Sequence, residues 1–366
     1  MKSFKNICKS ALIIAAGLFY QNTSSACTGI KLTAKDGSKI IARTMEWGSF
    51  EMPSQLFVTP RGYTKIAIMP NGDEGLHYTS KYGYVGIGVH KQNYVTEAVN
   101  EKGLAVEQFF FPQYGKSEKY DPSKKDISIT DGEILAWIVG SFATVDEVVE
   151  NLETIRMVEF GENAGTPHFS IMDKSGKQIV LEYFDNKWHI YDNKVGVITN
   201  SPSFDWQVTN LNNYINVLGG TTKPRNLNED VTLRSFGVGS AGLGLPGDMT
   251  PPSRFVRAAF FVNTAAPTEN GKSAVMQSFQ ILNNFDIPVG CEFGDDERDK
   301  IPNMPSATQW TTSIDTNALK FYYHTQWNRT IRCIDLNKID FDKIEYQTLA
   351  LDEVKENPLQ EVTFRK

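Results

Sequence analysis

The sequence predicts an α+β protein in which antiparallel sheets are covered by helices on their outer faces. Segments with the alternating pattern of strands are grouped together, and so are segments with helical spacing, whereas a parallel α/β sheet would alternate strands and helices one by one. Turn sequences at 35–38 (KDGS), 173–176 (DKSG) and 185–187 (DNK) separate neighbouring strands. No Pro- or Ser-rich linker and no repeat interrupts residues 27–366, so we expect a single domain there.

The predicted elements can be placed in order along the chain. Strands at 28–32 and 39–43 form a hairpin with Cys27 at one end and Arg43 near the other. The apolar segment 133–142 predicts a helix, and the capping box at 144–147 (TVDE) predicts the start of another that continues to residue 155. Further strands are expected at 55–59, 84–89, 105–111, 169–172, 178–184, 188–191, 196–199, 308–314, 319–323 and 331–336, and further helices at 253–263 and 274–283.

Residues 1–26 have the pattern of a signal peptide. Three lysines precede a short apolar core at 11–20, and the small residues 24–26 (SSA) suit the cleavage site of signal peptidase. The apolar run is about half of the ~20 residues needed to span a bilayer, so no membrane anchor is expected. We therefore expect a soluble, exported protein, periplasmic or secreted, that begins at Cys27.

Charge and motifs exclude several classes of function. The formal net charge is −6, and removal of a leader that holds three lysines and no acid makes the chain more acidic. Without blocks of Lys and Arg, such a chain is a poor partner for nucleic acid or an anionic membrane. The sequence has no Gly-rich phosphate loop and no His-Glu-x-x-His, so no cofactor and no metal are expected.

Three cysteines remain after removal of the leader: Cys27, Cys291 and Cys333. In an oxidising compartment two of them can pair, and Cys291 with Cys333 is the natural choice, although spacing does not decide whether they pair. This choice leaves the thiol of Cys27 free at the new N-terminus.

An N-terminal cysteine carries its own base. The freed α-amine has an ordinary pKa of about 7.7–8.0, so it can accept the thiol proton directly or through one water near neutral pH. Three other interpretations of Cys27 stay open: a lipid-modified cysteine, a disulfide partner and an ordinary buried cysteine. Lipoprotein signals usually carry Leu three residues before the cysteine, where this chain has Ser24.

A series of short segments recurs in a fixed order along the chain: 27–29 (CTG), 43–46 (RTME), 100–104 (NEKGL), 200–202 (NSP), 204–206 (FDW), 245–248 (LPGD), 250–251 (TP) and 253–255 (SRF). Together, from Cys27 to about Leu336, they resemble the choloylglycine hydrolase family, which comprises bile salt hydrolases and penicillin V acylases. The resemblance implies a four-layer αββα sandwich of the N-terminal-nucleophile hydrolase type. It also implies hydrolysis of a side-chain amide through an acyl-cysteine intermediate.

The resemblance assigns roles to the first two segments. Cys27 is the nucleophile and its α-amine the base. Arg43 lies beside the thiol, where a guanidinium favours thiolate. Glu46 takes the place of an aspartate that in the family usually holds the amine. The alternatives are a surface arginine at the end of a hairpin strand and an exposed glutamate on an edge.

The later segments supply the remaining roles. Asn200 is expected to donate its side-chain NH₂ to the oxyanion, and the backbone N–H of Phe110 is expected to be the second donor. Arg254 matches the family arginine near the nucleophile and is expected in the first turn of a helix, whereas Asp248 is expected to be structural. Asn200 can also be read as a turn residue, and Arg254 as part of a structural salt bridge.

The expected substrate is a small-molecule acyl amide, and we favour conjugated bile salts. Trp47 and Phe50 are the expected substrate contacts. Because side chains alternate along a strand, the side that lines the pocket carries either Phe110 alone or both Phe109 and Phe111. Penicillin V acylase and related N-acyl amide acylases are the alternatives within this chemistry. From a different class, the chain can be read as a non-catalytic exported binding lipoprotein. The resemblance also implies a homo-oligomer, a tetramer, that uses an arm between Asn213 and Leu245.

Overall fold

The computed structural model describes residues 26–48, 50–89, 94–161, 166–291 and 308–364. The predicted signal peptide, residues 1–26, lies outside the described residues except for Ala26. In the described part of the chain, no helix has the length and apolar character needed to cross a membrane.

Two antiparallel sheets form the centre of the molecule. The first has six strands in the order β14 (Val197–Ile198), β1 (Thr28–Thr33), β2 (Lys39–Glu46), β17 (Thr308–Asp315), β18 (Lys320–Thr325) and β19 (Arg332–Asp335). The second has eight strands in the order β13 (Lys187–Asp192), β12 (Gln178–Phe184), β11 (Pro167–Met172), β8 (Ala105–Phe110), β7 (Val95–Asn100), β6 (Tyr84–Val89), β3 (Ser54–Thr59) and β20 (Gln347–Ala350).

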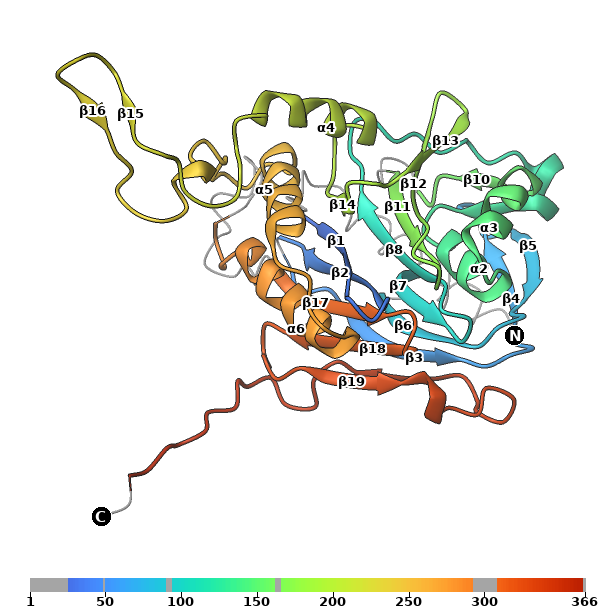
Figure 1. Ribbon diagram of the computed structural model, residues 1–366. Helices are drawn as coiled ribbons and strands as arrows, with labels where there is room; N and C mark the ends of the chain where they lie inside the picture. Colours follow the sequence, from blue (N-terminus) through green and yellow to red (C-terminus); the bar gives the residue numbers. More distant parts are fainter. Residues whose placement is uncertain (1–25, 49, 90–93, 162–165, 292–307, 365–366) are drawn as a thin grey trace.

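Helices cover the outer face of each sheet (Figure 1). The helices α5 (Pro251–Thr264) and α6 (Gly271–Leu282) pack on β1, β2 and β17 of the six-stranded sheet. The helix α2 (Ile134–Ser141) packs on β7 and β8 of the eight-stranded sheet, and the buried residues of α3 (Val145–Asn151) belong to the same hydrophobic cluster. The predicted α+β sandwich with four layers, αββα, is therefore confirmed.

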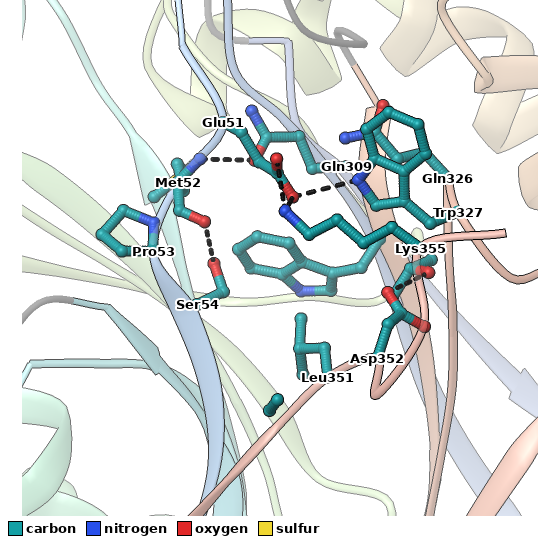
Figure 2. A pocket seen from close by; sticks show the side chains of 13 residues that line it. Glu51, Met52, Pro53, Ser54, Gln309, Gln326, Trp327, Leu351, Asp352 and Lys355 are labelled. Carbon is teal, nitrogen blue, oxygen red and sulfur yellow. Dashed lines mark hydrogen bonds and ion pairs between the residues drawn. The ribbon is translucent and has the colours of Figure 1, made fainter.

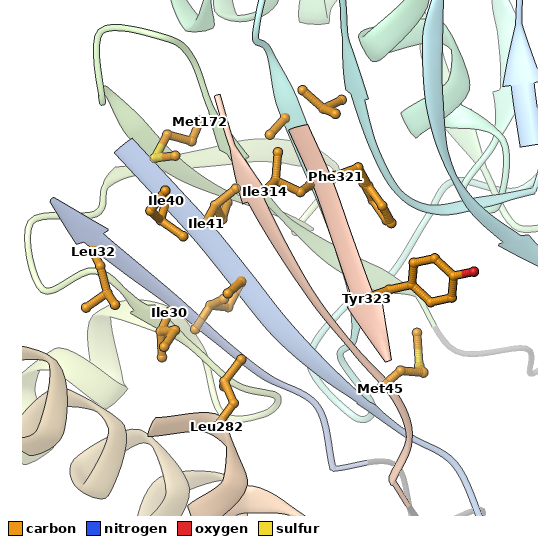
Figure 3. Close-up of a cluster of buried hydrophobic side chains, with 14 of the residues drawn as sticks. Ile30, Leu32, Ile40, Ile41, Met45, Met172, Leu282, Ile314, Phe321 and Tyr323 are labelled. Carbon is orange, nitrogen blue, oxygen red and sulfur yellow. The ribbon is translucent and has the colours of Figure 1, made fainter. Parts of the chain in front are cut away.

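The six-stranded sheet is buried on both faces. Ile40 and Ile41 are successive residues of β2 whose side chains point to opposite faces, and both are fully buried. Their cluster reaches from Leu282 of α6 on one side to Met172 of β11 in the other sheet (Figure 3). This explains why three apolar residues, 40–42, follow one another in β2 without a polar residue between them.

Gly29 allows the two sheets to approach closely beside Cys27. A Cβ atom at this position would lie 2.6 Å from Cζ of Phe109 in the eight-stranded sheet and 2.7 Å from Cγ2 of Ile198. Real Cβ contacts do not come this close, so any side chain here would push the two sheets apart. The glycine after Cys27-Thr28 therefore has a packing role.

Most of the predicted elements are present, and the differences lie in their ends and in short strands. Thr144 caps α3 by accepting a hydrogen bond from the Glu147 N–H at 3.2 Å, as predicted. The helix ends at Asn151 and not at residue 155, because the Asn151 and Thr154 side chains bond to nearby backbone carbonyls and a 3-10 turn follows. The elements that were missed include the helix α4 (Phe204–Asn210) and the strands β4 (Thr64–Ile68), β5 (Glu74–Thr79), β7, β9 (Ser128–Thr130), β10 (Arg156–Val158), β15 (Arg225–Asn226), β16 (Thr232–Leu233) and β20.

Cys291 and Cys333 are both free thiols, and both residues are exposed. Cys333 belongs to the edge strand β19, whereas Cys291 ends a turn that begins at Pro288. The disulfide considered from the sequence is therefore not formed.

An arm projects from the body between α4 and α5 (Figure 1). It carries the short hairpin β15 (Arg225–Asn226) and β16 (Thr232–Leu233). Large apolar side chains along it are exposed to solvent: Ile215, Leu218, Leu227, Val231, Leu233, Phe236, Val238 and Leu243. A monomer rarely leaves so many of these side chains uncovered.

Candidate active site

Cys27 lies immediately before β1 and is buried, with 2% of its surface exposed. The pairing of Thr28 with Thr44 and of Gly29 with Arg43 brings it next to the end of β2. Its Sγ is 3.8 Å from Sδ of Met45 and 4.0 Å from the backbone oxygen of Glu46. The hairpin therefore brings Cys27 and the 43–46 segment together, as the sequence predicted.

The side chain of Arg254 joins Cys27 to the rest of the site. This residue is in the first turn of α5, as predicted, and is fully buried. Its Nη1 donates to the carbonyl oxygen of Cys27 at 2.5 Å and to Oγ1 of Thr28 at 3.0 Å. Its Nη2 donates to Oδ1 of Asn200 at 2.7 Å, and its Nε donates to the Met249 carbonyl at 2.8 Å. One guanidinium thus binds both the Cys27-Thr28 segment and Asn200.

Asp248 fixes the start of α5. It accepts hydrogen bonds from the Ser253 hydroxyl at 2.6 Å and from the Thr250 backbone and hydroxyl. These bonds lower its pKa to about 2. Its contacts belong to the cap of the helix that carries Arg254, as expected for a structural residue.

The contacts of Asn200 determine which way its amide points. Because a guanidinium only donates, the atom that faces Arg254 has to be Oδ1. The amide nitrogen therefore points the other way, where it donates to the Phe110 carbonyl oxygen at 2.8 Å. An amide NH₂ has two hydrogens, and the contact with Phe110 uses one of them. Asn200 and Phe110, 90 residues apart in the chain, thus meet in one place.

Arg43 is buried between the two sheets. Its guanidinium donates to the Gln108 carbonyl at 2.5 Å, pairs with Glu97 at 3.3 Å and lies 4.5 Å from the Phe109 ring centre. Its Nη2 is 3.5 Å from the same Met45 sulfur that the Cys27 thiol contacts. Burial alone lowers the pKa of Arg43, but the nearby thiol of Cys27 and the carboxylates raise it above its ordinary value. The alternative of a surface arginine is thereby excluded.

Two buried carboxyl groups face Arg43. Burial raises the pKa of Glu97, although Arg43 and the Trp310 indole, which donates to Glu97 at 2.6 Å, oppose this effect. Burial raises the pKa of Glu107 to about 8, again with Arg43 opposing. Neither carboxyl was found from the sequence. Glu97 lies in β7, which was not predicted, and Glu107 lies in a predicted strand where no local pattern marks it as facing a buried arginine.

Glu46 is fully buried at the end of β2, which excludes an exposed edge position. Its Oε1 accepts a hydrogen bond from the Thr308 hydroxyl at 3.0 Å, on the neighbouring strand β17. By strand alternation its side chain points to the face opposite Arg43 and Met45. The carboxylate of Glu46 therefore lies on the helix-covered face of the sheet.

Trp47, Phe50 and Phe110 form a partly exposed aromatic group. The rings of Trp47 and Phe50 are 6.0 Å apart, those of Trp47 and Phe110 are 6.2 Å apart, and both pairs meet edge to face. Phe109 and Phe111 are instead fully buried. Of the three consecutive phenylalanines, Phe110 is thus the one beside Trp47.

Gln309 holds the loop that carries two of these aromatic rings. Its amide nitrogen donates to the carbonyls of Trp47 at 3.2 Å and Phe50 at 2.9 Å, and its oxygen accepts from the Met52 N–H at 2.8 Å. Figure 2 shows Gln309 beside a pocket of about 320 Å³ that Trp327, Leu351 and Lys355 also line. Cys27 does not line this pocket. Gln309 was missed from the sequence because its role depends on a contact 262 residues away.

Among the described residues, no group of three or more His, Cys, Asp and Glu side chains is arranged to hold a metal ion.

The chain is similar to known proteins over most of its length. Residues 27–349 match the family described as linear amide C–N hydrolases, choloylglycine hydrolase family. The chain is 32% identical to a bile salt hydrolase/transferase of Clostridium perfringens over 88% of this chain and 96% of that protein. It is 30% identical to a penicillin V acylase of Pectobacterium atrosepticum over 82% of this chain and 78% of that protein.

A solved structure agrees with the fold. The crystal structure of a mutant conjugated bile acid hydrolase from Clostridium perfringens superposes with a TM-score of 0.79 at 31% identity, covering 92% of this chain and all of that one.

The raised pKa of Glu107 predicts a loss of stability at alkaline pH. The folded state keeps this carboxyl protonated up to about pH 8, whereas the unfolded chain loses the proton near its ordinary value of 4.5. The stabilisation is therefore complete below pH 4.5 and is lost as pH rises through about 8. We expect Glu107→Gln to melt at a less pH-dependent temperature than the wild type between pH 5 and 9, measured by differential scanning fluorimetry. Glu345→Gln, at an exposed position, is the control. If the melting temperatures of the wild type and of Glu107→Gln changed equally with pH, the prediction would be contradicted.

Proposed function

Because this chain belongs to the choloylglycine hydrolase family and is a hydrolase of linear amide bonds, we propose that it cleaves the amide bond of conjugated bile salts with Cys27 as nucleophile. The observation that carries the proposal is that Arg254 donates hydrogen bonds both to the Cys27 carbonyl and to the Asn200 side chain. These two hydrogen bonds hold the backbone of Cys27 and the side-chain amide of Asn200 to the same guanidinium.

The first half of the reaction forms an acyl-enzyme. The freed α-amine of Cys27 accepts the thiol proton, and the positive charge of Arg43 favours the thiolate. The sulfur attacks the amide carbon, and the carbonyl oxygen becomes an oxyanion that accepts hydrogen bonds from Asn200 Nδ2 and the Phe110 N–H. One such donor contributes roughly 10²–10³ to the rate. The amine product leaves with the proton that the α-amine took from the thiol.

The second half releases the acid. A water molecule gives a proton to the α-amine and attacks the thioester carbon. The C–S bond breaks and the sulfur regains the proton. In this scheme Glu46 holds the α-amine from the helix-covered side of β2. The net reaction consumes one water and yields one acid and one amine.

The partly exposed rings of Trp47, Phe50 and Phe110 support a bulky apolar acyl group. Phe110 presents a hydrocarbon ring beside Trp47, which suits a steroid. The bile salt hydrolases among the relatives support the same choice. The second candidate is penicillin V, supported by the similarity to a penicillin V acylase, and fatty-acyl amides are a further possibility within this chemistry.

The proposal includes export and removal of residues 1–26, because only this cut exposes the α-amine of Cys27. The buried position of the thiol against Met45 argues against a lipid chain on the sulfur. We therefore favour an exported enzyme over a lipid-anchored binding protein.

Release assays test the proposed substrate. The processed protein is incubated with glycine- and taurine-conjugated bile acids and with penicillin V, and the amine product is measured. We expect the fastest release from a conjugated bile acid. Cys27→Ala should lose essentially all turnover because no other thiol lies at the site, and Cys27→Ser should be severely impaired because a hydroxyl ionises far less readily than a thiol. Wild-type activity in Cys27→Ala would defeat the assignment.

Mass spectrometry of the exported protein tests the N-terminus. We expect a chain that begins at Cys27 with an unmodified amine. A variant that begins at Met with Ala26 retained should be inactive, since its Cys27 nitrogen is an amide. A diacylglyceryl mass on the first residue would instead support the binding lipoprotein.

We also propose that the arm joins copies of this chain into a tetramer. Its exposed apolar side chains support this, since association removes them from water. Sedimentation velocity should show a tetramer for the wild type and smaller species for the double variant Phe236→Ser, Val238→Ser. A wild-type monomer at micromolar concentration would refute the assembly.

A further inference from the structure

The inference concerns His168 of β11 and Glu182 of β12, neighbours in the eight-stranded sheet that no step of the proposed mechanism uses. Both are buried, with 2% and 0% of their side chains exposed. The His168 Nδ1 is 3.1 Å from Glu182 Oε1, and its Nε2 is 3.0 Å from the backbone oxygen of Thr199. Thr199 directly precedes Asn200. The imidazole thus links the eight-stranded sheet to the segment that carries the proposed oxyanion donor.

The two contacts determine where the protons lie. A carbonyl oxygen only accepts, so Nε2 carries a hydrogen and donates it to Thr199. A second proton then lies between Nδ1 and Glu182, either on the imidazole or on the carboxyl group. In both arrangements the pair has no net charge, which limits the cost of burying it.

The pair holds the segment 199–204 at both ends. His168 binds the Thr199 carbonyl at its beginning, and Glu182 Oε1 accepts the Phe204 N–H at 2.9 Å at its end. The imidazole is itself fixed by Phe111, which stacks on it at 4.4 Å with an angle of 3° between the planes. The segment therefore cannot shift along or away from the sheet without breaking a buried hydrogen bond.

We propose that His168, supported by Glu182, is a positioning residue that sets the place of Asn200 for the oxyanion. The inference rests on the proposed function, because it takes Asn200 as the donor. Arg254 fixes the direction of the Asn200 amide, whereas the pair fixes the backbone from which the amide extends. A displacement of about 1 Å in a catalytic group costs roughly 10²-fold in rate.

The test is a set of variants measured on the better of a glycine-conjugated bile acid and penicillin V. His168→Phe keeps a flat ring on Phe111 but cannot donate to Thr199, and we expect kcat to fall about 10²-fold with KM little changed. His168→Gln places an amide N–H near the same carbonyl and should recover most of kcat. His324→Phe is the matched control, since His324 is also a buried histidine packed on a phenylalanine, Phe279, but lies in β18. It should keep wild-type kcat.

A double-mutant cycle with Asn200→Ala separates positioning from general damage. If His168 acts through Asn200, His168→Phe lowers kcat in the wild type but has no further effect in the Asn200→Ala background. Cys27 should react with iodoacetamide at the wild-type rate in all variants. His168→Met, a smaller residue without a donor, replaces His168→Phe if thermal melting shows that the latter does not fold.

Three results would overturn the inference. Unchanged kcat in His168→Phe, or an equal loss in both backgrounds, would remove the positioning role while the proposed function stands. Wild-type kcat in Asn200→Ala would instead defeat the donor assignment in the proposed function, and the inference with it.

Discussion

The site depends on one buried guanidinium. Arg254 donates to four oxygens from three separate parts of the chain: the Cys27-Thr28 segment, Asn200, and Met249 shortly before α5. The planar fork of an arginine gives its hydrogen bonds fixed directions, so each acceptor is held at a set angle as well as a set distance. Lysine offers a single charged nitrogen on a flexible stem and cannot replace this arrangement. The position of α5, which carries Arg254, therefore bears directly on the position of the Cys27 backbone relative to the Asn200 side chain.

The space between the two sheets combines a hydrophobic core with a chain of buried polar groups. Arg43 faces Glu97 and Glu107, and His168 faces Glu182, among aliphatic and aromatic side chains. Unpaired charges would be costly in such surroundings: Arg43 pairs with Glu97, His168 pairs with Glu182, and burial raises the pKa of Glu107 to about 8. The low polarity strengthens every remaining electrostatic interaction, including that between Arg43 and the thiol. The burial of these groups between the two sheets thus both fixes their positions and strengthens their electrostatic interactions.

The parts of the structure that the sequence predicted are those encoded locally. The hairpin that brings Cys27 beside Arg43 follows from a turn and two apolar runs, and the start of α5 follows from Pro251 and its flanking residues. The meeting of Asn200 with Phe110 was expected only through resemblance, since the two are far apart in the chain. Gln309, Met45 and His168 were missed because their roles arise from packing across strands, and single residues of these types carry no local signal. The end of α3 was misplaced because side-chain bonds to the backbone ended the helix early.

The burial of Ala26 has a consequence for the order of events in the cell. Its side chain is 3% exposed and packs with Ile287 and Met249, the residue whose carbonyl Arg254 holds. A peptidase has to enclose an extended stretch of chain on both sides of the bond it cuts, and a residue inside the packed body does not offer one. In the proposed maturation, the cut between Ala26 and Cys27 would therefore have to precede folding. Under that proposal, folding would bury a terminus that had already been freed.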